Sequence, residues 1–167
     1  MFFAKNMVQS KENKMLHKIK EFIKEKQSEN FVESAEQKAE KIKASVAAIL
    51  LEIAYCDDDF SDDERIRVTA ILKEKFDLND EETEELIKTG QKERDQSVDL
   101  WHFTKMINEN YSKKEKIDVI EMLWRVVYAD SVLHSHEDYL IHKLSTLLRL
   151  DHKEFIGAKL RAESSKP

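Results

Sequence analysis

The sequence predicts an all-α fold, and two observations lead to this class. Charged residues make up 37% of the 167-residue chain and hydrophobic residues 41%, with only two glycines and one proline. This composition is typical of amphipathic helices joined by few sharp turns. Apolar residues recur at helical spacing, and the alternating runs and turn dipeptides that strands require are missing. We predict a single globular domain over residues 31–163, after a lead of residues 1–30 and before a tail of residues 164–167.

The lead contains one predicted element, an amphipathic helix from Met15 to Lys26. Residues 1–13 before it are polar and show no periodicity. The apolar face of the helix consists of Leu16, Ile19, Phe22 and Ile23. Lysines lie on the opposite face, which is the pattern of a helix at a polar boundary. We expect this helix to dock on the domain, and peripheral contact with an anionic membrane surface is the alternative.

The domain is predicted to open with two longer helices. The first spans residues 34–55, and its buried stripe consists of Val46, Ile49, Leu50 and Ile53. Ser61 and Glu64 then match a capping box. In this motif the serine hydroxyl accepts a hydrogen bond from the Glu64 backbone N–H, and the Glu64 side chain accepts one from the backbone N–H of the serine. The helix that this box opens is predicted to run to Phe76.

A short acidic helix is predicted next, over residues 81–88. We expect it to end near Gly90, because glycine commonly follows the last turn of a helix. Residues 91–96 are all polar. They are therefore predicted to form a linker between the two halves of the domain.

The second half is predicted to contain four helices, of which the first spans residues 97–109. Ser112 and Glu115 form a second capping box. The helix that follows, through Val127, is apolar nearly all round by its end, so we expect it to be the central buried helix. Two more helices complete the domain.

The last predicted helix is capped by Asp151, and we place Leu160 on its inner face. Both tryptophans of the chain, Trp101 and Trp124, fall on apolar helical stripes. Tryptophan on such a stripe is more often a core residue than a ligand-stacking surface. We therefore predict that both are buried.

An internal repeat relates the two halves. A shift of 73 positions superimposes Tyr55 on Tyr128, Asp57 on Asp130, Phe60 on Leu133 and Glu64 on Glu137. The apolar positions on either side follow the same shift. Because two copies are too few for a solenoid, they predict a globular domain with pseudo-two-fold symmetry. We expect residues 42–76 and 115–148 to superpose by a near-two-fold rotation.

The repeated acids are the candidate site. Asp57 and Asp130 end a helix, where the helix dipole disfavours a negative charge. Glu64 and Glu137 open the next helix, where capping alone is a sufficient explanation. Ca²⁺ and Mg²⁺ take six or more oxygen ligands, and one aspartate with one glutamate supplies too few. All four acids together, brought close by the pseudo-symmetry, would form a divalent-metal site, with simple helix caps as the alternative.

Three segments resemble the TerB-like family of tellurite-resistance proteins: residues 122–130, 136–141 and 155–160. Residues 54–64 resemble the earlier acidic turn of the same family. The shared motif is an aspartate at a helix end followed by glutamate seven residues later, and the resemblance covers about residues 34–162. It implies an all-helical fold of about seven helices and a divalent-metal site at the paired acids. It also implies a role in a membrane-linked response to tellurite and other chemical stress.

Charge and composition exclude several other classes. Between Asp57 and Glu85 the chain has thirteen acidic and four basic residues. The net negative charge of this segment exceeds that of the whole chain, so the rest of the chain has a net positive charge. Such an acidic centre argues against nucleic acid and favours cations or basic partners. No run of eighteen apolar residues occurs, and the single cysteine, Cys56, suits a reducing compartment. We find no Gly-rich phosphate loop and no Ser-His-Asp arrangement.

Histidines suggest one alternative metal. His134 and His136, with Glu137, have the ligand types that Zn²⁺ prefers. A surface or capping role is the simpler interpretation, because His134 precedes a helix start and His142 falls on a predicted solvent face.

Three hypotheses for function follow. The first is a non-enzymatic, cytoplasmic module that binds Ca²⁺ or Mg²⁺ and acts with other stress-response proteins, some of them membrane-bound. The second is a metal-free acidic domain that recognises basic segments of other proteins. The third is a carboxylate-metal hydrolase, which would require a nucleophile that the sequence does not show.

Overall fold

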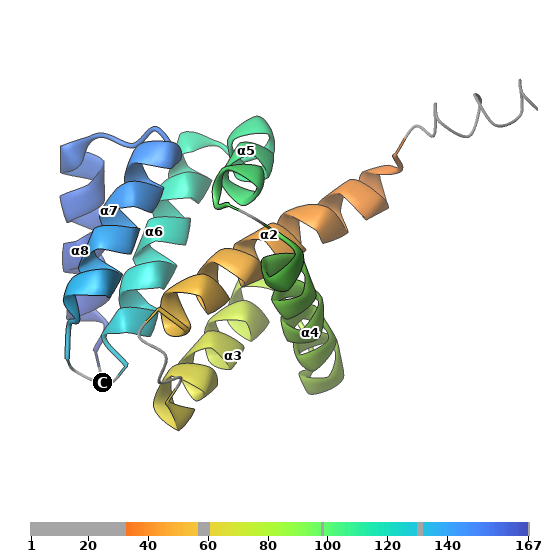
Figure 1. Ribbon diagram of the computed structural model, residues 1–167, viewed down its shortest axis with the longest axis horizontal. Helices are drawn as coiled ribbons and strands as arrows, with labels where there is room; N and C mark the ends of the chain where they lie inside the picture. Colours follow the sequence, from red (N-terminus) through yellow and green to blue (C-terminus); the bar gives the residue numbers. More distant parts are fainter. Residues whose placement is uncertain (1–32, 57–60, 98, 130–131, 167) are drawn as a thin grey trace, which may run out of the picture. The chain divides into compact units, whose positions relative to one another are not determined.

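The computed structural model describes residues 33–56, 61–97, 99–129 and 132–166. These residues form seven α-helices and no strand, so the predicted fold class is confirmed (Figure 1). The chain divides into two compact units, Met1–Gln37 and Lys38–Pro167. The predicted helix from Met15 to Lys26 lies outside the described residues. The domain bounds inferred from the sequence stay predictions.

The helices carry the labels of Figure 1. They are α2 (Ala35–Ala54), α3 (Asp62–Phe76), α4 (Asp80–Gln96), α5 (Trp101–Asn110), α6 (Lys113–Val127), α7 (Ser135–Leu147) and α8 (His152–Ser164). Five of them begin in the same way: the glutamate at the third helical position accepts a hydrogen bond from the backbone N–H of the residue before the helix. The capping boxes predicted at Ser61, Ser112 and Asp151 are among these five. None of the helices in the described part of the chain is long and apolar enough to cross a membrane.

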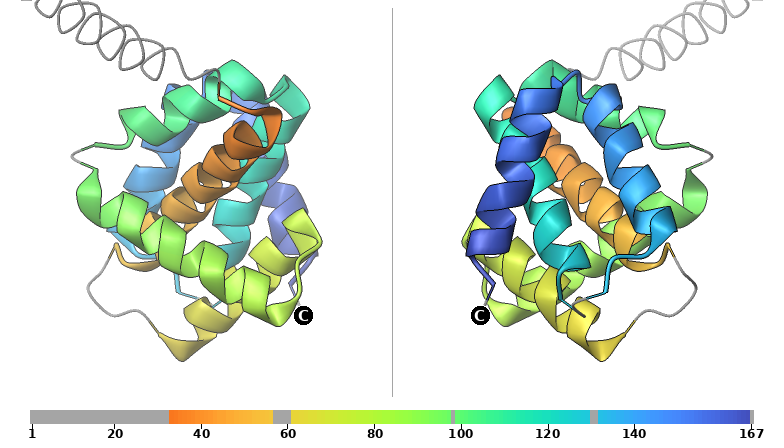
Figure 2. Two further views of the ribbon diagram at one scale, coloured as in Figure 1. Left: turned by 90° about the vertical axis from the view of Figure 1, so that its right-hand side faces the viewer. Right: turned by 90° about the vertical axis from the view of Figure 1, so that its left-hand side faces the viewer.

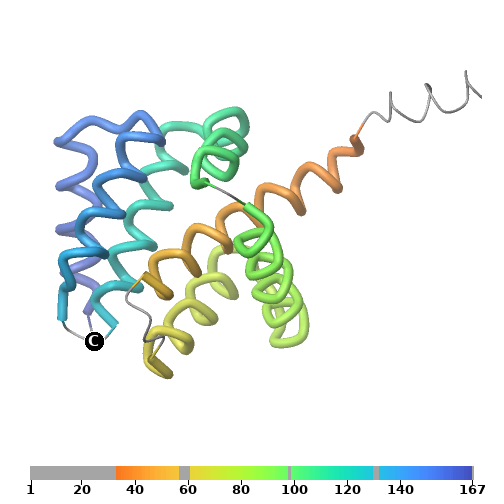
Figure 3. The backbone as a smooth tube through the Cα atoms, viewed as in Figure 1, coloured from red at the N-terminus to blue at the C-terminus, as the bar shows by residue number. Residues whose placement is uncertain are grey.

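The core is built around α6 and the second half of α2. The α6 helix packs against α3, α7 and α8. Figure 3 shows it running between the blue segments of α7 and α8 and the yellow segment of α3. Its Trp124 is fully buried, which confirms both the central position of α6 and the burial predicted for this tryptophan. In α2, every residue from Ala44 to Ala54 is buried except Glu52. The two most apolar stretches of the sequence therefore form the interior.

The prediction for α4 was wrong at its C-terminal end. The helix continues to Gln96, so residues 91–96 are its last turns and not a linker. Gly90 is buried in the middle of α4 against α2, where a Cβ atom would lie 2.8 Å from the Cβ of Ala47. Arg94 bonds Glu52 of α2 through its Nε atom. Close packing and this ion pair hold the polar turns on α2, and neither is visible in a local sequence pattern.

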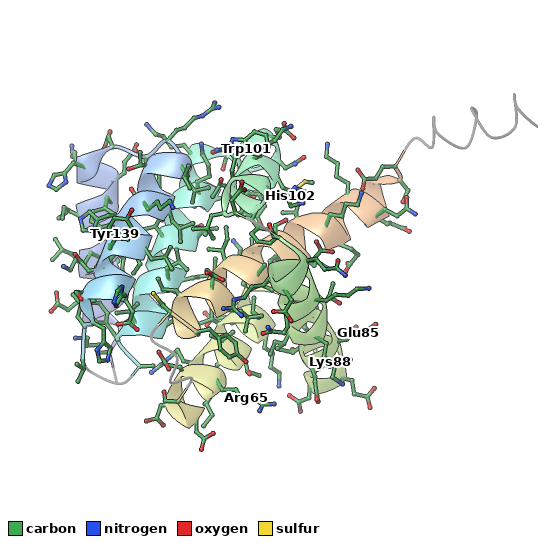
Figure 4. All side chains as sticks on the ribbon, viewed as in Figure 1. Arg65, Glu85, Lys88, Trp101, His102 and Tyr139 are labelled. Carbon is green, nitrogen blue, oxygen red and sulfur yellow. The ribbon has the colours of Figure 1, made fainter. Side chains whose placement is uncertain are left out.

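Two residues predicted to be inside are exposed. Trp101 is 57% accessible, and Leu160 on α8 is 56% accessible. Trp101 is the first residue of α5, which begins four residues later than predicted because Asp99 Oδ1 accepts from the Trp101 N–H at 3.0 Å. Figure 4 shows the labelled Trp101 at the surface of α5.

Local features recur along the chain at nearly the predicted spacing. Helices α2 and α6 end at Ala54 and Val127, and α3 and α7 begin at Asp62 and Ser135, so both pairs are 73 positions apart. Helices α4 and α8, which begin at Asp80 and His152, are 72 positions apart. The similarity of element boundaries thus extends over three helices in each half. Superposition of the two halves by a near-two-fold rotation stays a prediction.

Candidate functional site

Glu64 is the third residue of α3 and is only 2% exposed. Its Oε2 atom accepts from the backbone N–H of Ser61 at 2.9 Å and from the Ser61 hydroxyl at 3.0 Å. The Glu64 N–H in turn donates to the Ser61 Oγ atom at 3.2 Å. The local sequence thus fixes where α3 begins and which way this carboxylate turns.

Glu137 is in the same position of α7 and is fully buried. Its Oε2 atom accepts from the backbone N–H of His134 at 2.9 Å, the same bond at the same length as in the first copy. The turns that precede these helices also agree. Cys56 N donates to Ile53 O at 3.2 Å, and Ala129 N donates to Val126 O at 3.0 Å.

The other capping-box glutamates differ from this pair in burial. Glu82 is exposed, and Glu115 and Glu154 are half-buried. The bond from the Ser112 backbone N–H lowers the pKa of Glu115. The Lys113 Nζ atom, 2.6 Å from the carboxylate, lowers the pKa of Glu154. Capping therefore does not by itself require a buried carboxylate, and the burial of Glu64 and Glu137 is a separate feature of the two acidic turns.

The two helices that carry the buried glutamates in their first turns begin at one end of the helix bundle. The starts of α3 and α7 are at the lower edge of the unit in both views of Figure 2. Asp57 and Asp130, the other two predicted ligands, lie outside the described residues. Within the described ranges, no three His, Cys, Asp or Glu side chains are grouped as metal ligands. The four-acid site stays a prediction, of which the structure places two members.

The histidines near the second turn have ordinary surroundings. His142 is exposed, its Nδ1 atom is 2.8 Å from the carbonyl oxygen of Asp138, and its ring lies 4.4 Å from that of Phe155. His136 and His152 are exposed in the first turns of α7 and α8. The part of the chain that the structure describes thus gives no support to the zinc alternative.

Sequence reasoning missed a groove between α2, α4 and α5. The cavity has a volume of about 520 Å³. One of its walls is a face of α4, with Glu82, Glu85, Leu86, Thr89 and Glu93. A helix that ended near Gly90, as predicted, would leave Glu93 in a linker. Helical spacing from residue 82 to residue 93 is the signal that would have found this face.

Comparison with models of protein families gives a match. The family model described as tellurite resistance protein TerB matches residues 43–160. Neither a search of curated proteins nor a search of solved structures returned a match. The matched range includes both acidic turns and runs from α2 into α8. The chain therefore belongs to the TerB family of tellurite-resistance proteins.

Proposed function

We propose that this TerB domain binds a divalent cation, Ca²⁺ or Mg²⁺, through Asp57, Glu64, Asp130 and Glu137. It would act without catalysis in the cellular response to tellurite and related chemical stress. Membership of the family supports the link to tellurite resistance. The observation that carries the metal proposal is the pair of buried glutamates at equivalent positions of α3 and α7.

Burial of a carboxylate is costly unless other groups compensate for the lost hydration. A nearby dication is one such compensation, and it favours the charged form of each acid. The donor set fits a hard cation, because all four side chains offer carboxylate oxygens and none offers sulfur or nitrogen. Asp57 and Asp130 stand seven residues before Glu64 and Glu137 in the sequence.

The proposal extends to location and partners. We place the protein in the cytoplasm, with other stress-response proteins as partners, including membrane-bound ones, and no nucleic acid. The segment from Met15 to Lys26 would add peripheral contact with an anionic membrane. A metal-free domain that binds basic segments is the second candidate function, and the acidic face of α4 favours it.

Metal binding is expected to raise the melting temperature of the full chain. At a free cation concentration ten times Kd, the free energy of unfolding should increase by about 1.4 kcal/mol. Asp130→Asn should abolish most of this increase, while the metal-free variant should be as stable as the parent or more so, because repulsion between carboxylates falls. Differential scanning calorimetry with Ca²⁺, Mg²⁺ or chelator measures both effects. Asp58→Asn, which also removes one negative charge, should leave the metal response intact.

A second pair of variants distinguishes the contribution of helix capping to stability from that of metal binding. Glu115→Ala removes a capping box far from the acidic turns, so it should cost about 1 kcal/mol with or without metal. Glu137→Ala should instead lose stability and the metal response together. A melting temperature that is indifferent to both cations would reject the metal centre, leave the acids as helix caps and make the interaction domain the leading function.

A further inference from the structure

The groove between α2, α4 and α5, here called the acidic groove, has an apolar floor. Ala44 and Leu86 are buried, and Leu78 and Met106 are half-buried. These side chains come from three helices and the α3–α4 connection. An apolar floor of this kind suits the apolar face of an amphipathic helix. Among the described residues there is no strand edge to which an extended peptide could be added.

The rim of the acidic groove is negatively charged. Four glutamates and two lysines line it, with His102 on α5. Glu40 is paired with Lys43, whose Nζ atom lies 2.9 Å from the Glu40 carboxylate, and Glu82 caps α4. Within the described part of the chain, the carboxylates of Glu85 and Glu93 have neither an ion pair nor a hydrogen bond. Figure 4 labels Glu85 on α4 and His102 on α5.

Glu85 and Glu93 have no acidic counterpart in the second half of the domain. Helices α4 and α8 begin 72 positions apart, and the capping glutamate is present in both, as Glu82 and Glu154. At the same shift, Glu85 corresponds to Gly157, and Glu93 corresponds to Ser165. The capping glutamate is repeated, whereas Glu85 and Glu93 occur in one half alone.

We propose that the acidic groove binds a lysine-rich amphipathic helix of a partner protein. The apolar face of that helix would lie on Leu86 and Met106, and its lysines would meet Glu85 and Glu93. An anionic membrane or a nucleic acid would be repelled by the same rim. The proposal deepens the second candidate function, which is the binding of basic segments. It does not rest on the proposed metal centre, because none of the four acids of that centre lines the groove.

The test uses a fluorescein-labelled helical peptide with leucines on one face and lysines on the other, titrated with the full-length protein and followed by anisotropy. Glu85→Lys combined with Glu93→Lys should weaken binding at least tenfold. Glu81→Lys combined with Glu84→Lys is the matched control, because it makes the same charge change on the same helix outside the groove. The control should retain most of the affinity, and circular dichroism checks that both variants fold.

Three outcomes would overturn the proposal in distinguishable ways. Equal losses in the two double variants would mean that the peptide responds to net charge and not to the groove. Equal affinity for a peptide whose lysines are replaced by glutamates would show that charge complementarity does not contribute to binding. No binding of the lysine peptide by the parent protein would reject the groove and the basic-partner function together, while the metal titration described above would be unaffected.

Discussion

Replacing Gly90 with alanine is expected to destabilise the domain by about 2 kcal/mol. The new Cβ would lie 2.8 Å from the Ala47 Cβ and 3.2 Å from the backbone of α2. Neither contact can be relieved by rotating a side chain, so α2 and α4 must separate. Overpacking of this kind costs up to about 3 kcal/mol, and the better helix propensity of alanine returns about 1 kcal/mol. Urea denaturation, with an unchanged slope and a lower midpoint, measures the difference.

Gly157 in α8 is the matched control. There, the nearest atom to a new Cβ is the Arg161 Nη1 atom at 3.3 Å, the far end of a flexible side chain. Gly157→Ala should therefore stabilise the domain by about 0.5–1 kcal/mol through helix propensity. Stabilisation at both positions would show that α2 and α4 do not pack as closely as the structure has them.

Replacing Trp124 with alanine is expected to cost about 4 kcal/mol, the largest effect of any variant considered. The side chain is fully buried, its ring is stacked on Tyr128 with centroids 5.6 Å apart, and Lys159 Nζ lies 4.6 Å from its centroid. Truncation would leave a cavity between α6 and α8 and remove these ring contacts.

Trp124→Phe should cost only about 1 kcal/mol. The Trp124 Nε1 atom is buried and has no acceptor among the described residues. Phenylalanine lacks this N–H, so folding of the variant no longer takes an unbonded polar group out of water. The free energy gained in this way offsets part of the free energy lost with the smaller apolar area. Thermal unfolding of the three proteins gives the comparison. A phenylalanine variant as unstable as the alanine variant would imply that the Nε1 atom has an acceptor in solution.

At the candidate site, the sequence predicted which residues are equivalent, but it did not predict that they are buried. The shift of 73 positions pairs Glu64 with Glu137 from the residues alone, because repeated chemistry is visible as repeated letters. Their burial is not visible in the same way, since a capping glutamate is exposed at Glu82 and buried at Glu64 although both accept from the backbone N–H of the residue before the helix. Burial depends on what other helices place over the carboxylate.

The sequence by itself determined where α3, α6 and α8 begin. Ser61, Ser112 and Asp151 each accept a hydrogen bond from the N–H of a glutamate three residues later, and such bonds need no partner from elsewhere in the chain. It also determined the fold class and the central position of α6, because a helix that is apolar nearly all round must be covered on most of its sides.

Only the tertiary structure decided how far α4 extends and which apolar residues are covered. Gly90 is a contact point with Ala47, not a helix end, because α2 passes too close for any side chain. Trp101 and Leu160 lie on apolar stripes, yet no neighbouring helix of the described part of the chain covers them. The acidic groove has the same origin: its walls come from three helices, and the spacing within one helix cannot show what the other two place opposite it.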